Sequence, residues 1–190
     1  MAKPAIQHPK SKNQNLDVAI VVGSDSDLPV MTQATTVLNE FDIAYEVKIL
    51  SAHRTPQMLE QYVASFGRRR VKVVISAAGG AAHLAGRIAS LTTLPVIGIP
   101  VNTGSLGGLD ALLSTVQMPA GIPVLTVAIG KAGATNAVLA AIEILALGRP
   151  ALARRMAAYR KRMGNVVSRK NAELQRLGVE QYVRKTSTHG

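Results

Sequence analysis

Short apolar runs alternate with helix-type segments along most of the chain. The run at residues 18–22 is wholly apolar, which is typical of a strand buried on both faces of a parallel sheet. Further β-type runs lie at residues 44–50, 71–77, 95–99 and 123–129. Segments with apolar residues at helical spacing follow the runs, at residues 27–38, 56–66, 81–91, 109–117 and 132–147. This alternation predicts an α/β fold with an open, doubly wound parallel sheet of five strands.

Composition and helix-breaking residues divide the chain into three parts. Residues 1–15 are polar and basic, and they predict a disordered leader without the apolar region of a secretory signal. Residues 16–147 form the predicted α/β domain. Residues 148–190, which open with Gly148-Arg149-Pro150, predict a basic amphipathic helical tail. The apolar stripe of this tail would dock either on its own subunit or on a neighbouring one.

The net charge of +11 belongs to the two ends of the chain. Residues 148–190 contain eleven Lys or Arg and two acidic residues, whereas residues 16–147 contain eight basic and nine acidic residues. The chain has no Trp and only two Phe, so it lacks the aromatic platform on which single-stranded nucleic acids stack. We therefore expect the tail to be a solvated helix face and not a nucleic-acid interface.

Composition also excludes several kinds of site. The chain has no cysteine, which excludes disulfides, thiolate metal sites and a cysteine nucleophile. No apolar stretch reaches the ~20 residues that span a bilayer, so we expect no membrane contact and a cytoplasmic location. No group of His, Asp and Glu has metal-ligand spacing, so we expect no metal.

Three polar motifs follow predicted strands: Gly23-Ser24-Asp25-Ser26-Asp27, Ser51-Ala52-His53-Arg54-Thr55-Pro56 and Gly79-Gly80-Ala81-Ala82-His83-Leu84. The carboxyl ends of parallel strands converge on one crevice, so we expect the motifs to form a single pocket. In the first motif, Ser24 and the free amides of a helix start suit a phosphate, and Asp27 suits ribose hydroxyls. The alternative is that these residues are ordinary helix caps, with Asp27 at the N-cap.

The second motif combines an anion-binding side chain with a proton carrier. Arg54 can hold a phosphate with its bidentate fork, and Ser51 can add a hydroxyl. Histidine is the side-chain type that both gives and takes a proton near neutral pH, which makes His53 a candidate general acid/base. The alternative is that His53 is a surface histidine on a loop.

The third motif places small residues beside the expected ligand. Gly79 and Gly80 allow a backbone to approach a ligand closely. His83 either binds a planar ring or its carboxylate, or it holds the shape of the loop. The residues alone leave both roles open.

Together the motifs closely resemble the 5-(carboxyamino)imidazole ribonucleotide mutases, the bacterial-type (class I) enzymes of the AIR carboxylase family. The resemblance runs from about residue 18 to residue 147. It includes, in order, GSDSD at 23–27, SAHRTP at 51–56, AGGAAHL at 78–84, LPVIGIPV at 94–101, GLDALLSTVQMP at 108–119 and GATNA at 133–137. It implies a three-layer α/β/α fold of the flavodoxin-like kind, usually assembled as a homo-octamer.

The resemblance also implies an activity. A mutase of this kind is an isomerase of purine biosynthesis that moves a carboxylate from the exocyclic nitrogen of an aminoimidazole ribonucleotide to ring carbon 4. It does so without metal, ATP or organic cofactor, and an ATP-dependent 5-(carboxyamino)imidazole ribonucleotide synthase supplies its substrate. The implied substrate-binding residues are Ser24, Asp27, Ser51, Arg54, Gly79, Gly80, His83 and Leu84, and the implied general acid/base is His53.

Two segments depart from the family pattern. Leu28 replaces the tryptophan often found after SDSD, and Ala85-Gly86-Arg87 replaces the usual Pro-Gly-Met. Arg87 would either point into solvent or alter the closure of the loop around the carboxylate.

Two alternative functions stay open. The first is the class II reaction, in which carbon dioxide carboxylates the aminoimidazole ribonucleotide directly. The second is a non-catalytic ribonucleotide-binding module. The presence of His53 argues against the module, because binding alone does not need an acid/base.

Overall fold

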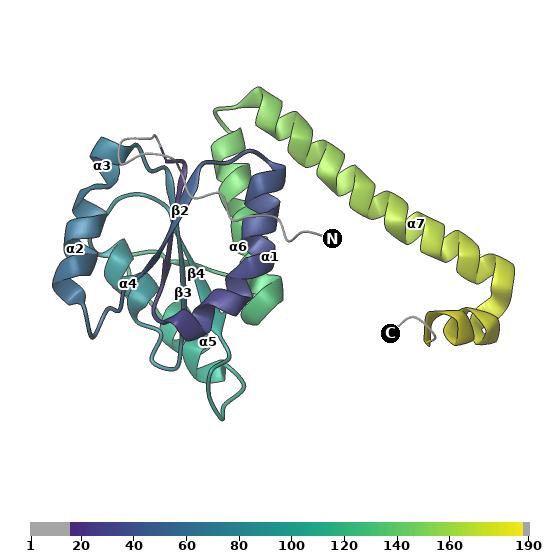
Figure 1. Ribbon diagram of the computed structural model, residues 1–190, viewed down its shortest axis with the longest axis horizontal. Helices are drawn as coiled ribbons and strands as arrows, with labels where there is room; N and C mark the ends of the chain where they lie inside the picture. Colours follow the sequence, from purple (N-terminus) through teal and green to yellow (C-terminus); the bar gives the residue numbers. More distant parts are fainter. Residues whose placement is uncertain (1–15, 188–190) are drawn as a thin grey trace. The chain divides into compact units, whose positions relative to one another are not determined.

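The computed structural model describes residues 16–187, so the predicted leader at residues 1–15 lies outside the described part. The chain divides into two compact units, Met1–Gly148 and Arg149–Gly190. The strands of the first unit are β1 (Val18–Val22), β2 (Tyr45–Ile49), β3 (Val73–Gly79), β4 (Val96–Val101) and β5 (Leu125–Thr126). They form one parallel sheet in the order β2-β1-β3-β4-β5 (Figure 1).

This strand order confirms the predicted flavodoxin-like, doubly wound sheet. The order of the strands reverses at β1, which pairs with β2 on one side and with β3 on the other. Val22, at the end of β1, lies in register with both Ile49 and Ala77. The segments that follow these three strands therefore leave the sheet side by side, at the switch point where such folds bind ligands.

Helices cover both faces of the sheet. They are η1 (Asp25–Asp27), α1 (Leu28–Glu40), α2 (Pro56–Ala64), α3 (Phe66–Arg69), α4 (Leu84–Ala89), α5 (Leu109–Val116) and α6 (Gly130–Ala146). α1 and α6 pack together on one face, and α2, α3 and α4 lie on the other (Figure 1). Fully buried side chains such as Leu59, Phe66 and Ile88 join these last helices to the sheet, each stabilising the fold by about 1.5–3 kcal/mol.

Two elements are shorter than the pattern predicts. The expected strand at residues 123–129 forms ladder pairs only at Leu125 and Thr126, because Pro123 has no N–H to donate and Gly130 already begins α6. The expected helix at residues 81–91 begins only at Leu84, because the preceding residues make a tight turn. Those residues therefore remain in the loop at the end of β3.

A half-buried polar cluster fixes α2 and α3 to the edge strand β2. Glu46 accepts hydrogen bonds from Tyr62 Oη at 3.0 Å and from Arg69 Nη2 at 2.7 Å. Burial opposes ionisation of Glu46, but the bonds from Arg69 and Tyr62 outweigh it and lower the pKa of Glu46. Burial and the charge of Glu46 raise the pKa of Tyr62. The cluster holds α2, whose first residue follows the Ser51-to-Thr55 segment of the second motif.

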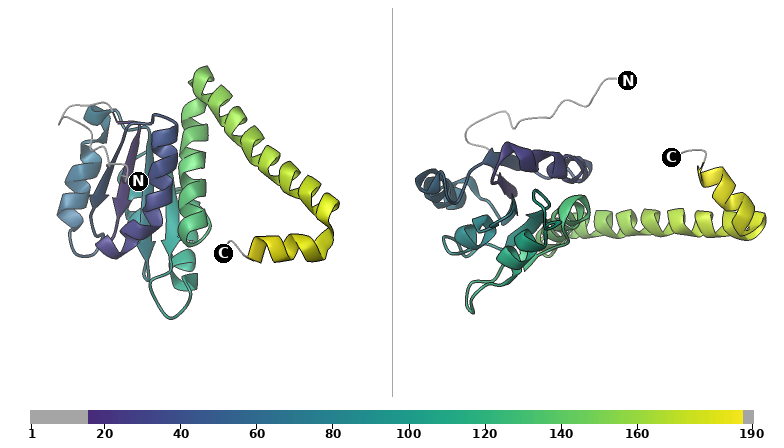
Figure 2. Two further views of the ribbon diagram at one scale, coloured as in Figure 1. Left: turned by 45° about the vertical axis from the view of Figure 1, so that its right-hand side comes forward. Right: turned by 90° about the horizontal axis from the view of Figure 1, so that it is seen from below.

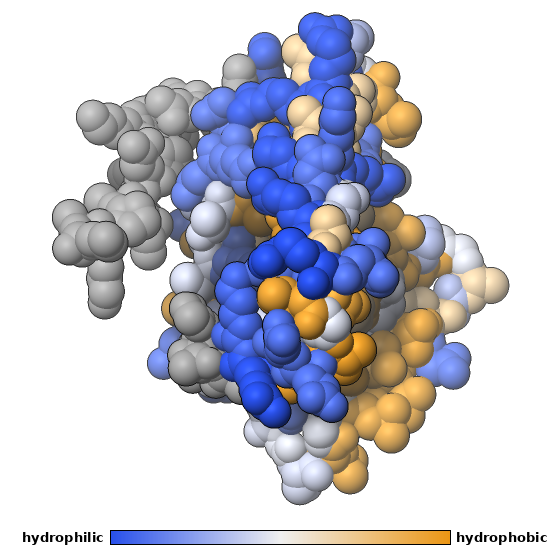
Figure 3. All heavy atoms as spheres, turned by 90° about the vertical axis from the view of Figure 1, so that its right-hand side faces the viewer, coloured by the Kyte–Doolittle hydropathy of each residue, from blue (hydrophilic) through white to orange (hydrophobic). Residues whose placement is uncertain are grey.

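The second unit is the helical tail, α7 (Pro150–Ser187), which is broken at Gly178, where φ is 73° (Figure 2). An ion pair between Lys185 and Glu173 joins the segments before and after the break. Leu152 and Met156 are buried, whereas Met163 is 54% exposed. The many Lys and Arg side chains make the surface of α7 largely hydrophilic (Figure 3). Among residues 16–187, no helix is long and apolar enough to cross a membrane.

Candidate active site

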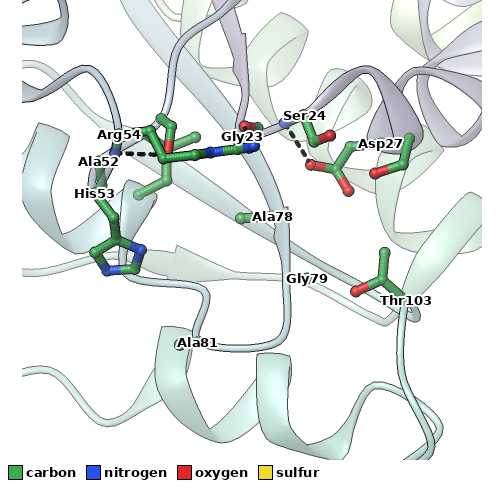
Figure 4. Close-up of a pocket in the computed structure, with 13 residues that line it drawn as sticks. Gly23, Ser24, Asp27, Ala52, His53, Arg54, Ala78, Gly79, Ala81 and Thr103 are labelled. Carbon is green, nitrogen blue, oxygen red and sulfur yellow. Dashed lines mark hydrogen bonds between the residues drawn. The ribbon is translucent and has the colours of Figure 1, made fainter.

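The carboxyl ends of the central strands surround a cavity of about 290 Å³ (Figure 4). The structure brings all three polar motifs to it. The predicted site residues that line the cavity are Ser24, Asp27, Ser51, His53, Arg54, Gly79 and Leu84. Gly80 and His83 belong to the same loop but do not line the cavity. Gly80 has a φ of 60°, so it supplies the left-handed turn after β3.

His83 contacts His53 instead of the cavity. His53 Nε2 and His83 Nδ1 are 2.9 Å apart, and the two rings meet edge to face with centroids 5.0 Å apart. One of these nitrogens must donate and the other accept, so the contact holds one proton between the rings. His83 can therefore set the orientation of the His53 ring, and both side chains are exposed enough to exchange protons with a ligand or with water.

The second motif is a compact turn that leads directly into α2. Ser51 N–H donates to Thr55 Oγ1 at 2.9 Å, and Thr55 Oγ1 donates back to Ser51 O at 3.1 Å. Pro56 then occupies the first position of the helix, where its missing N–H costs nothing. The turn presents His53 and Arg54 on adjacent positions at the cavity.

Arg54 spans the second and first motifs. Its Nη2 donates to the carbonyl oxygen of Gly23 at 3.1 Å, and its backbone N–H donates to Ser51 Oγ at 3.1 Å. The guanidinium is exposed and carries further N–H groups, so it can serve an anion placed beside Ser24.

Asp27 is a buried carboxylate at the wall of the cavity, only 3% exposed. Its Oδ2 accepts from the backbone N–H of Ser24 at 3.0 Å, which closes the η1 turn. Asp27 stands at the N-cap position of α1, as predicted, but its side chain makes no capping hydrogen bond to that helix. Burial raises the pKa of Asp27, against the lowering effect of the backbone N–H groups of Ser24 and Gly23.

Replacing Asp27 with asparagine is expected to stabilise the protein and weaken ligand binding. When folding raises the pKa of an acid, its protonated form favours the folded state. This stabilisation is fully present at pH values below the ordinary pKa of 3.8, and it is lost as the pH rises through the raised pKa. The amide of D27N keeps an acceptor for Ser24 N–H, so the melting temperature of D27N should exceed that of the wild type at pH 7, and the gap should narrow as pH falls. Ribonucleotide affinity should drop by about tenfold or more. A lower melting temperature of D27N at pH 7 would contradict this account.

The side chain of Thr103 leaves no room for a side chain at position 79. A Cβ placed on Gly79 would lie 1.9 Å from Thr103 Oγ1 and 2.9 Å from Thr103 Cβ. Thr103 thus fills the space that a side chain on Gly79 would take, whereas Gly79 itself lines the cavity, and the close approach of its backbone to a ligand stays a prediction. Thr103 itself lines the cavity, on the side away from His53 (Figure 4).

We expect Gly79→Ala to destabilise the fold by about 1–3 kcal/mol through overpacking. Removing the whole Thr103 side chain in G79A/T103G should recover most of this loss, which chemical denaturation can measure. Gly80→Ala is the matched control: its added Cβ meets no atom within 4 Å, so its cost of about 1 kcal/mol comes from the positive φ. Thr103→Gly should not restore the stability of G80A. If the losses of unfolding free energy in G79A and T103G simply add in the double mutant, the clash between Gly79→Ala and Thr103 is disproved.

Sequence reasoning missed part of the cavity wall. The missed residues are Gly23, Ser26, Ala52, Ala78, Ala81 and Thr103. Most of them stand inside or next to the three motifs. Thr103 follows β4, so the rule that ligands bind at the carboxyl ends of strands could have found it.

Arg87 turns away from the cavity. Its guanidinium makes an ion pair with Glu60 of α2, and both side chains are partly exposed. Of the two expectations for Arg87, the structure favours an outward position on the helix. Leu28 is 37% exposed and does not line the cavity either. Within residues 16–187, no group of His, Asp or Glu has the arrangement of a metal site.

Comparisons with known proteins show the family of this chain. A sequence profile of the AIR carboxylase family matches residues 17–166. The N5-carboxyaminoimidazole ribonucleotide mutase of Mycobacterium tuberculosis is 53% identical over 84% of this chain and 91% of its own length, and that of Thermotoga maritima is 50% identical over 87% and 96%. The crystal structure of Treponema denticola PurE, 26% identical, covers 83% of this chain and 97% of its own with a TM-score of 0.76. The chain therefore belongs to the AIR carboxylase family.

Proposed function

We propose that this chain is an isomerase of purine biosynthesis. It converts 5-carboxyamino-1-(5-phospho-D-ribosyl)imidazole to 5-amino-1-(5-phospho-D-ribosyl)imidazole-4-carboxylate. The observation that carries this proposal is the convergence of a histidine, an arginine and a buried carboxylate on one cavity, in a chain about half identical to named mutases.

The cavity supplies groups for each part of the ribonucleotide. Arg54 and the Ser24 hydroxyl serve the phosphate, with Ser51 assisting, and the Asp27 carboxylate accepts from ribose hydroxyls. In this proposal the loop from Gly79 to Leu84 surrounds the imidazole and its carboxylate. Three of its residues, Gly79, Ala81 and Leu84, line the cavity. No metal, ATP or organic cofactor takes part in this proposal.

His53 performs both proton transfers. As an imidazolium it protonates the carbamate nitrogen, whose bond to the carboxylate then breaks and releases carbon dioxide and the neutral aminoimidazole. Ring carbon 4 attacks the trapped carbon dioxide and forms the new carbon–carbon bond. The neutral His53 then removes the proton from the tetrahedral carbon, which restores the ring and the imidazolium.

The released carbon dioxide must stay in the cavity between the two bond changes. Small apolar groups at Ala52, Ala78 and Ala81 line the wall near His53 and offer carbon dioxide no polar competitor. The proposal requires this space to close around the bound ribonucleotide, because such closure limits escape of a reactive intermediate. His83 fixes the His53 ring through the 2.9 Å contact, so that one ring position serves both transfers.

We further propose a homo-octameric, cytoplasmic enzyme that receives its substrate from an ATP-dependent 5-(carboxyamino)imidazole ribonucleotide synthase. Exposed apolar side chains in and around α5 support a subunit interface: Leu106, Leu109, Leu113, Val116 and Leu125. In this account residues 16–147 form the catalytic domain. The tail, residues 148–190, is a solvated basic helix that binds no nucleic acid.

The direct test mixes the purified protein with the carbamate ribonucleotide and no ATP, metal or bicarbonate. Formation of the ring-carboxylated isomer is the expected result. Turnover only of the aminoimidazole ribonucleotide with added bicarbonate would replace the proposal with the class II reaction. Ligand binding without turnover in either assay would support the alternative of a non-catalytic ribonucleotide-binding module.

A further inference from the structure

In the first motif, the carboxylate of Asp25 accepts hydrogen bonds from groups that could bind a phosphate. The Ser24 hydroxyl donates to Asp25 Oδ1 at 2.9 Å, and the backbone N–H of Ser26 donates to the same oxygen at 3.0 Å. Ser24 and Ser26 line the cavity, whereas the exposed Asp25 does not. One carboxylate oxygen at the rim of the cavity therefore takes two donors that belong to its wall.

These donors are of the kind that a phosphate needs. A phosphate oxygen, like a carboxylate oxygen, carries negative charge and accepts several hydrogen bonds at once. The hydrogen bond from Ser24, those from backbone N–H groups and the charge of Arg54 together lower the pKa of Asp25. The cation, the hydroxyl and the amide expected to hold the substrate phosphate thus already stabilise an internal carboxylate.

The Asp25 side chain is free to move aside. It lies on the surface, and it accepts hydrogen bonds from its immediate neighbours in sequence, Ser24 and Ser26. A rotation about its side-chain bonds would transfer the carboxylate to water and release both donors. The rotated carboxylate would still stand within one residue of the phosphate and would repel it through water.

We propose that Asp25 is an internal competitor that weakens binding of the ribonucleotide phosphate. This inference rests on the proposed function for the identity of the ligand. A phosphate must displace the carboxylate from Ser24 and Ser26, and it then binds beside a like charge. Both effects weaken substrate and product alike, so Asp25 raises KM and speeds release of the product.

Two substitutions separate the two effects. Asp25→Asn removes the charge but keeps an oxygen that can accept from Ser24 and Ser26, whereas Asp25→Ala removes both. Glu180→Gln is the control, because it makes the same change in net charge at an exposed position of α7. The probes are inorganic phosphate and ribose 5-phosphate, with affinity measured by calorimetric titration.

We expect D25N to bind both probes about threefold to tenfold more tightly than the wild type, and D25A at least as tightly as D25N. The gain of D25N should shrink as salt is raised, because it comes from charge repulsion. E180Q should bind like the wild type. Unchanged or weaker binding in both Asp25 variants would overturn the proposal and would make Asp25 a support of the loop.

A mutase assay on the same proteins tests the role of Asp25 and the proposed function separately. If the wild type isomerises the carbamate ribonucleotide, D25N should lower KM by a factor similar to its gain in phosphate affinity. A wild type that isomerises beside a D25N variant with unchanged or raised KM would refute the role of Asp25 alone. A wild type that binds phosphate but does not isomerise would refute the proposed function, while the binding data would still decide the role of Asp25.

Discussion

Replacing His53 with asparagine is expected to lower the rate of isomerisation by about two to four orders of magnitude, the usual contribution of a general acid/base. Asparagine cannot carry a proton between the exocyclic nitrogen and ring carbon 4. Asparagine is too short to replace the 2.9 Å contact of His53 Nε2 with His83 Nδ1. Both histidines are exposed, and the Ser51–Thr55 bonds that shape the turn do not involve the His53 side chain, so the loop should keep its shape. Ribonucleotide affinity should therefore stay within about threefold of the wild type. Turnover assays and calorimetric titration of the product measure the two quantities.

His83→Asn is the matched control for H53N. It removes the partner that orients His53 but leaves the proton carrier in the cavity. We expect a smaller loss of turnover in H83N than in H53N. Full turnover in H53N would contradict the proposed chemistry, and equal losses in the two variants would show that the histidines act as one unit.

Replacing Arg54 with methionine is expected to raise KM by about 100-fold and to change kcat much less. Methionine keeps most of the length of the side chain but has no charge and no N–H groups. Each hydrogen bond from a charged donor contributes about 1.5–3 kcal/mol, so loss of the fork from the phosphate accounts for this factor. The bond to the Gly23 carbonyl is also lost, but it lies at an exposed position, so the melting temperature should change little. Steady-state kinetics and thermal unfolding measure these effects.

Arg68→Met provides the control for R54M, because Arg68 is an exposed arginine of α3 that does not line the cavity. Its kinetic constants should equal those of the wild type. An R54M variant with unchanged KM and a reduced kcat would contradict the placement of the phosphate at Arg54.

The sequence predicted the fold because its strongest signals are local. Five β-type runs separated by helical spacing leave few arrangements of a parallel sheet, and the structure has the predicted one. The meeting of the motifs at one cavity followed from the same topology. The edge strand β5 was predicted too long, because an apolar run does not say how many of its residues find a partner strand.

Contacts between distant residues set the remaining details. Gly79 is small because Thr103, from the next strand end, fills the space beside it. Asp27 has the sequence position of a helix cap, but its carboxylate turns back to Ser24 instead. Arg87 meets Glu60 of another helix, and His83 meets His53. The spacing of residues along the chain does not specify which side chains meet in space. These contacts are therefore known only from the three-dimensional structure.

The retention of the migrating carboxylate tests the central claim most directly. The carbamate ribonucleotide would be labelled with ¹³C at its carboxylate and converted in the presence of unlabelled bicarbonate, and the label in the product would be measured by mass spectrometry. The account predicts that the product keeps the label, because carbon dioxide stays in the cavity between release and recapture. A product that carries unlabelled carbon in proportion to the bicarbonate would contradict the mutase and establish direct carboxylation from solution.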